Sequence, residues 1–231
     1  GRFENVICPR NDALVTVPAG READFESFLA AFDEILKNEY AGCDDGVSLA
    51  CAKEAVPAAL SAAATVALLH VLLALPQGVQ AMSADFPGLV QTSLSLGVMG
   101  MEADGLHFTL SIRSSIATQK AMLLQRIRAI VEYAGGTVTE RSAYPGWQYN
   151  RTSPLRELAL AAYKDVTGKD GVIAATHGGL ECGLFIEKLP GLDAISMGPE
   201  LHDVHSARER LSIPSTARVY RLVCEILKRS K

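Results

Sequence analysis

The chain has 231 residues, 48% hydrophobic and 21% charged, which excludes disordered, collagen-like and low-complexity proteins and leaves one large or two small domains. Twenty-two basic and 26 acidic side chains give a net charge of −4 with no basic stripe, so we expect neither nucleic acid nor membrane as a partner. Five cysteines without a Cys-x-x-Cys motif argue against a secreted disulfide scaffold and favour a cytoplasmic location.

The first third of the chain is expected to contain short strands and two helices. Residues 6–8 and 13–17 are apolar on either side of a turn rich in Pro, Asn and Asp. Apolar residues at helical spacing predict an amphipathic helix over residues 21–40, and a weaker alternation predicts a strand at 46–55. The Ala-rich run 58–75 is at the short end of a membrane span and contains polar residues, which favours a buried helix.

A β-hairpin followed by a helix is predicted next. The dipeptide Asp104-Gly105 between two alternating runs is a strong hairpin signal. The expected elements are strands at 93–100 and 106–113, a helix at 118–134 and a strand at 137–143. Strands that alternate with helices in this order predict a split βαβ, ferredoxin-like domain over residues 1–143.

The remaining residues, 144–231, have the pattern of an α/β domain. Ser153 followed by Pro154 predicts a helix N-cap. The expected elements are helices at 155–167, within 177–188 and at 215–228, with apolar strands at 172–175 and 194–197. Short apolar strands suit a buried parallel or mixed sheet, although two or three strands alone do not make a stable one.

Two polar loops follow the two predicted strands of this second domain. Residues 198–210 contain His202 and His205, whose imidazoles are possible metal ligands, although an exposed charged loop is the more ordinary interpretation. Residues 176–183 contain Gly178 and Gly179 and enter a helix whose free N–H groups suit a carboxylate or phosphate, unless this is an ordinary βα turn. Loops after successive strands often converge on one crevice.

Five single residues have both a structural and a functional interpretation. Arg113 ends a predicted strand, where it is either a surface charge or a two-pronged clamp for a substrate carboxylate. We expect Cys182 to be a buried thiol rather than a nucleophile, Trp147 to pack at the domain junction, His70 to lie in the core, and His107 to be solvated. The chain has no P-loop, Rossmann fingerprint or Gly-x-Ser-x-Gly elbow.

The stretch 177–184, His-Gly-Gly-Leu-Glu-Cys-Gly-Leu, closely resembles the His-Ala-Gly-Leu-Glu-Cys-Gly stretch of the aminoacyl-histidine dipeptidases, also called Xaa-His or cytosol non-specific dipeptidases. Gly178 replaces the usual Ala, which a tight turn should tolerate. Further stretches that resemble the same family, in order along the chain, are residues 5–10, 88–94, 112–115, 144–147, 190–199, 205–206 and 209–210. The resemblance therefore covers nearly the whole chain.

This resemblance implies a dinuclear zinc peptidase whose α/β catalytic domain is interrupted by an inserted lid domain of the split βαβ kind. The implied reaction is hydrolysis of unblocked dipeptides such as Xaa-His. Two zinc ions, with manganese or cobalt as alternatives, would activate a water for which a Glu is the general base. Because lid domains of this superfamily often make dimer contacts, the resemblance also implies a homodimer.

The family's functional residues match this sequence only in part. The resemblance implies that His205 is a metal ligand, that Arg113 reaches the substrate carboxylate, that Asn5 is a second lid contact, and that Gly179 and Glu181 help to bind substrate. The family's His-x-Asp motif, bridging Asp, Glu-Glu pair and lid histidine have no counterpart, so no catalytic residue is assigned. Since one His cannot hold two metals, we expect these 231 residues to be metal-poor and inactive alone.

Two alternatives stay open beside the dipeptidase. An aminoacylase- or carboxypeptidase-type amidohydrolase is disfavoured by Leu-Glu-Cys-Gly, because those relatives usually have Gly-Thr-Asp there. A non-catalytic module that dimerises through a sheet edge is compatible with the composition. A start at Gly1, directly ahead of an apolar strand, is the pattern expected of a piece cut from a longer protein.

Overall fold

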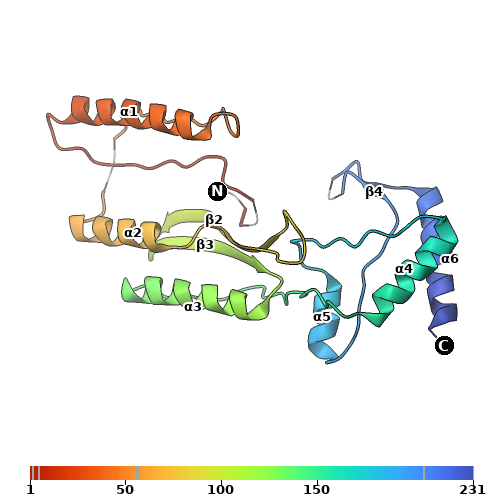
Figure 1. The fold of residues 1–231 in the computed structure, drawn as a ribbon. Coiled ribbons are helices and arrows are strands. Elements are labelled where there is room, and N and C mark those ends of the chain that lie inside the picture. Colours follow the sequence, from red (N-terminus) through yellow and green to blue (C-terminus); the bar gives the residue numbers. More distant parts are fainter. Residues whose placement is uncertain (2, 5, 56–57, 205, 231) are drawn as a thin grey trace. The chain divides into compact units, whose positions relative to one another are not determined.

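A computed structural model of the chain describes residues 1, 3–4, 6–55, 58–204 and 206–230 (Figure 1). The chain divides into two compact units, Pro9–Leu73 on the one hand and Gly1–Cys8 with Ala74–Lys231 on the other. The domain boundary expected between residues 143 and 144 stays a prediction.

The unit Pro9–Leu73 is mainly helical. Helix α1 (Glu22–Tyr40) confirms the predicted amphipathic helix, although none of its side chains is buried. Helix α2 (Ala62–Ala74) begins four residues later than predicted, only its Val71 is buried, and His70 is exposed, so the expected core histidine is wrong. A helix that is apolar all round needs neighbours on every side, and the described residues cover it only in part.

A three-stranded antiparallel sheet forms the middle of the other unit. The strands β1 (Gly78–Met82), β2 (Val90–Glu102) and β3 (Gly105–Ser114) lie in the order β1-β2-β3. The predicted hairpin is confirmed, since Glu102 pairs with Gly105 across a two-residue turn. Strand β1, which the sequence analysis missed, is short, mostly exposed and irregular in register, so it carries little alternation signal.

Helix α3 (Ala117–Tyr133) covers one face of this sheet, and the side chains of β2 alternate between that face and the opposite one. The helix packs along β3, as Figure 1 shows. Thr92 and Leu94 are each 1% exposed on the face toward α3, where Thr92 donates a hydrogen bond to Gln119 of the helix. Because side chains alternate along a strand, Ser93 points to the opposite face.

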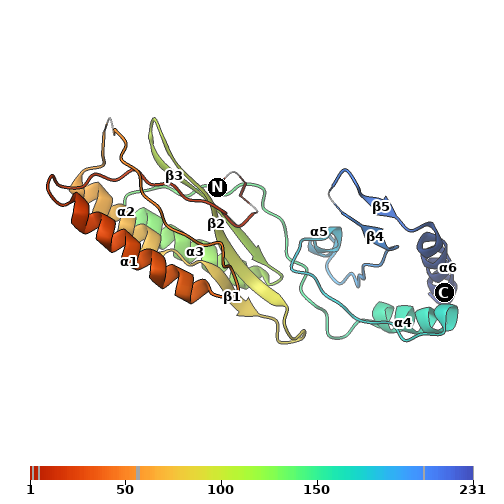
Figure 2. The ribbon, with the colours of Figure 1, turned by 90° about the horizontal axis from the view of Figure 1, so that it is seen from above.

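Three helices and a small hairpin follow. Helices α4 (Pro154–Thr167) and α6 (Ile213–Arg229) pack side by side (Figure 2), around a small core of Ala159, Ala162, Leu222 and Ile226. The predicted N-cap is confirmed, because the Ser153 hydroxyl accepts a hydrogen bond of 3.1 Å from the Arg156 amide and Pro154 follows. Helix α5 (Glu181–Lys188) precedes a hairpin of β4 (Leu201–His202) and β5 (Arg210–Leu211).

Six predicted strands are not strands in the structure: 6–8, 13–17, 46–55, 137–143, 172–175 and 194–197. A strand requires a neighbour that takes up its backbone hydrogen bonds, and the described residues provide none for these segments. Val172 is consequently 89% exposed, and Ser142 interrupts its segment with a φ of 53°. The mixed helix-and-sheet class is confirmed, and among the described residues the sheet expected to be ferredoxin-like consists of β1, β2 and β3.

Candidate functional site

A broad cleft opens in the unit formed by Gly1–Cys8 and Ala74–Lys231. It is lined by the ends of β2 and β3, by residues 144–151, and by the segment that leads into α5. Its volume of ≈ 1690 Å³ exceeds the roughly 300–1,000 Å³ that is usual for small-ligand pockets, so it has room for a short peptide. Both Arg113 and the loop containing Gly178 and Gly179 line it, so the structure brings these two sequence motifs to one cleft.

The register of the hairpin places Ser93 beside Arg113. These residues pair directly across β2 and β3, so their side chains share one face of the sheet. His177 lies near these two residues and belongs to the loop before α5. Its Nε2 is 2.8 Å from the Ser93 hydroxyl oxygen. Arg113 is exposed, and no carboxylate of the described residues lies within 4.0 Å of its guanidinium.

His177 is uncharged at neutral pH. Its pKa is lowered below the ordinary value, first by burial and then by the Arg113 guanidinium, while a hydrogen bond with the Val90 backbone acts in the opposite direction. An ordinary imidazole has a pKa of about 6.5, so the ring keeps one N–H donor and one acceptor at pH 7. Arg113 therefore provides the positive charge in this part of the cleft.

The segment Tyr144-Pro145-Gly146 fixes the spacing between β3 and α5. A Cβ added at Gly146 would lie 2.5 Å from the Ser114 carbonyl oxygen and 2.8 Å from that of Ser115. On its other side, a Cβ added at Gly183 of α5 would lie 3.0 Å from the Pro145 carbonyl oxygen. Lys120 donates a hydrogen bond of 2.8 Å to the Tyr144 carbonyl oxygen. The residues after Arg113 and the first turn of α5 therefore contact the same short segment.

The loop before α5 presents backbone groups rather than large side chains. Gly179 approaches Tyr144 so closely that an added Cβ would lie 2.6 Å from its ring. The Gly178 amide donates to the Thr176 hydroxyl at 3.2 Å, and Leu180 caps the helix without any side-chain hydrogen bond. The first amide groups of α5 thus lack a side-chain acceptor. An exposed Glu181 begins the helix.

A polar network lies directly behind Arg113 and Ser93. The Thr92 and Ser114 hydroxyls are 2.8 Å apart, and both Thr92 and Gln91 donate to the Gln119 side-chain oxygen. Sequence reasoning missed this network and Ser93 itself. The stretches 88–94 and 112–115 that resemble the family contain most of these residues, but their pairing depends on the hairpin, whose register shifts between Leu96 and Val98.

Several expected positions fall elsewhere. Asn5 and His205, the expected lid contact and metal ligand, lie outside the described residues. His202 is exposed in β4, and Cys182 is half-buried, with its sulfur 3.9 Å from the Ile195 carbonyl oxygen. Trp147 is half-buried in the wall of the cleft.

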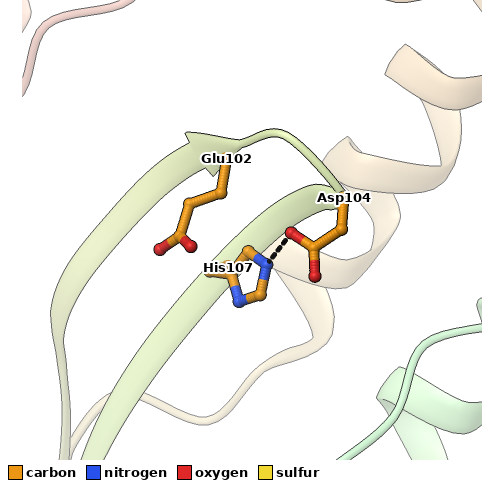
Figure 3. A group of neighbouring side chains, drawn as sticks. All are labelled: Glu102, Asp104 and His107. Carbon is orange, nitrogen blue, oxygen red and sulfur yellow. Dashed lines mark hydrogen bonds and ion pairs between the residues drawn. The ribbon is translucent and has the colours of Figure 1, made fainter.

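One group of possible metal ligands lies at the hairpin tip instead of in the cleft. Glu102, Asp104 and His107 have ligand atoms within 4.8 Å of one another (Figure 3), and all three side chains are exposed. A 2.8 Å hydrogen bond between Asp104 and His107 lowers the pKa of the carboxyl and raises that of the imidazole. Among the described residues no other three such side chains gather this closely, so the described part of the cleft does not by itself fit a dinuclear zinc centre.

Comparisons with a curated protein and with a solved structure both find dipeptidases as relatives. No protein-family model matches the chain. The chain is 33% identical over 229 residues to the cytosol non-specific dipeptidase of Escherichia coli strain K12, in an alignment covering 99% of this chain and 47% of that protein. The aminoacylhistidine dipeptidase of Vibrio alginolyticus superimposes with a TM-score of 0.83 at 27% identity, over 93% of this chain and 44% of that chain.

A third protein shares the fold alone. The aminopeptidase PepT of Bacillus cereus matches 71% of this chain and 44% of its own with a TM-score of 0.56 at 15% identity. The chain spans less than half the length of each of these relatives. No helix in the described part of the chain is long and apolar enough to cross a membrane. Nearly the whole of this chain therefore matches a little under half of the length of aminoacyl-histidine dipeptidases, also called cytosol non-specific dipeptidases.

Proposed function

We propose that the cleft binds the free carboxylate of an unblocked dipeptide, and that the protein to which it belongs hydrolyses dipeptides such as Xaa-His. One observation carries this proposal, namely that Arg113 is exposed in the cleft without a carboxylate partner among the described residues, beside the glycine loop before α5. A guanidinium forms two parallel hydrogen bonds with a carboxylate, which makes Arg the side chain suited to the end of a peptide.

The surroundings of Arg113 support a short peptide as the ligand. His177 is neutral and adds no second positive charge beside Arg113. The loop at Gly178 and Gly179 has no side chains beyond Cα, which lets a peptide approach its backbone. We propose that Gly179 and Glu181 contact the substrate there, and that Asn5 adds a contact from the lid, residues 1–143.

The proposal includes zinc, with manganese or cobalt as alternatives. When bound, two such ions would polarise the scissile carbonyl and supply an activated water. We propose His205 as a ligand, while the described residues of the cleft are assigned to substrate binding and to no metal step. We therefore expect the 231-residue chain alone to bind well under two zinc ions and to turn over no dipeptide. A zinc content near two per chain, or turnover, would contradict this part of the proposal.

We also propose a cytoplasmic homodimer. The sequence has five cysteines and no Cys-x-x-Cys motif, which supports a reducing compartment. Large apolar side chains on α1 are exposed, among them Phe28 at 60% and Ile35 at 49%, which supports an interface with a second copy. Light scattering on the purified chain should give twice the monomer mass.

The dipeptide site is tested by the fluorescence of Trp147, the single tryptophan, which lines the cleft. We expect Ala-His to change this fluorescence, and its C-terminal amide to bind about tenfold or more weakly, because a hydrogen bond to a charged group contributes about 1.5–3 kcal/mol. Arg113→Met should remove the difference between acid and amide. Arg126→Met is the matched control, an exposed arginine of α3 outside the cleft. Equal binding of acid and amide by the parent chain would refute the proposal.

A further inference from the structure

The loop before α5 is attached to the sheet through His177. Its ring hydrogen-bonds the Ser93 hydroxyl at 2.8 Å and also interacts with the Val90 backbone, so two positions of β2 hold one side chain. Ser93 and His177 are 84 positions apart in the sequence, and each belongs to a separate element of the cleft. The hydrogen bond therefore joins the strand that carries the partner of Arg113 to the loop that carries Gly178 and Gly179.

The position of Ser93 ties this hydrogen bond to Arg113. Ser93 and Arg113 are direct cross-strand neighbours, which fixes their Cβ atoms about 4.5–5.5 Å apart. Because Arg113 lowers the pKa of His177, the guanidinium and the imidazole also interact with each other. Any shift of the loop away from Ser93 must change the distance from Arg113 to the loop backbone.

We propose that the Ser93–His177 hydrogen bond is a positioning clasp, which holds the loop before α5 at the distance from Arg113 that one dipeptide spans. This inference rests on the proposed dipeptide function. Ser93 and His177 act through the placement of Arg113 and the glycine loop, and neither is assigned a role in bond cleavage. With the clasp in place, Arg113 holds the carboxylate while the loop contacts the remainder of the same ligand.

The clasp is tested with a matched pair of substitutions at Ser93. Ser93→Thr keeps the hydroxyl and Ser93→Val has nearly the same shape without it, so only the valine variant should lose affinity for Ala-His, by about 3- to 10-fold. Ser95→Val is the control, because Ser95 lies on the same face of β2 and has no hydrogen bond to the loop. At the other end, His177→Gln should retain more affinity than His177→Leu, because only the amide can bond to Ser93.

A double-mutant cycle separates positioning from general stabilisation. If the clasp places the loop relative to Arg113, Ser93→Val should weaken Ala-His binding much less in the Arg113→Met background than in the parent chain. Additive losses, or equal affinities of the threonine and valine variants, would overturn the clasp. In either of those cases the parent chain would still bind Ala-His better than its amide, and the proposed function would stand. Failure of the parent chain to bind Ala-His would instead overturn both.

Discussion

Replacement of Gly146 by alanine tests how the cleft is held together. The added Cβ would lie 2.5 Å from the Ser114 carbonyl oxygen and 2.8 Å from the carbonyl carbon and oxygen of Ser115. All of these are backbone atoms, so no flexible side chain can move out of the way. Gly146 does not have a positive φ, and alanine is therefore compatible with its backbone conformation. The cost of the substitution is one of packing alone.

The expected magnitude follows from two opposing effects. Overpacking typically costs about 1–3 kcal/mol, and the smaller conformational entropy of alanine in the unfolded chain returns about 0.4–1 kcal/mol. A net loss of about 1–2 kcal/mol lowers the melting temperature of a chain of this size by about 2–8 °C. Because the contact falls on the two residues after Arg113, the affinity for Ala-His should fall as well.

Thermal unfolding followed by circular dichroism, together with the Ala-His titration, measures both effects. Gly100→Ala is the control, because a Cβ there meets no atom within 4 Å and the residue lies outside the cleft. We expect Gly100→Ala to melt at or slightly above the parent temperature and to bind Ala-His normally. If Gly146→Ala melted and bound like Gly100→Ala, Tyr144-Pro145-Gly146 would not be wedged between β3 and α5.

Three further results are expected. Asp193 accepts hydrogen bonds of 2.9 Å from both the Ser153 hydroxyl and the Leu155 amide, so Asp193→Ala should lower the free energy of unfolding in urea by about 1–3 kcal/mol. Asp170→Ala is the control and should cost nearly nothing, because the Asp170 side chain is 84% exposed and its ion pair with Lys164 lies at the surface. Because the pKa of His177 is lowered in the folded chain, its imidazole is protonated in the unfolded chain at a higher pH than in the folded one. The free energy of unfolding should therefore decrease as the pH falls below about 6.5, the ordinary pKa of an imidazole. His177→Gln should therefore lose less stability than the parent chain between about pH 7.5 and pH 5.5, and an identical loss would contradict the lowered pKa. Asp104→Asn at the hairpin tip should leave Ala-His affinity unchanged, since its side chain lies outside the cleft.

Local signals predicted much of the fold. The helical periodicity of α1 and α3, the Ser153-Pro154 cap of α4 and the Asp104-Gly105 hairpin each depend on residues close together in the sequence, and each is confirmed. The predicted strands at 172–175 and 194–197 failed for the opposite reason. Their apolar character was read correctly, but a strand exists only with a neighbour to pair with.

The candidate site divides in the same way. Arg113 and the glycine loop could be singled out from residue type and position, and the structure brings them to one cleft. Ser93 could not, because its place opposite Arg113 depends on a register that shifts at Gly97. Asp193 was missed as a second acceptor at the start of α4 because it lies 40 positions from Ser153. Asn5 and His205 lie outside the described residues, and their roles stay predictions.

The most direct test of a dipeptide site in this cleft is to map where an unblocked dipeptide binds. Backbone amide chemical shifts of the isotope-labelled chain would be recorded during a titration with Ala-His up to millimolar concentrations. We expect the largest shifts at Ser93, Arg113 and Gly179, with small ones at the hairpin-tip residue His107. A ligand that perturbs none of the three, or that perturbs His107 more strongly, would contradict the assignment of this cleft to dipeptide binding.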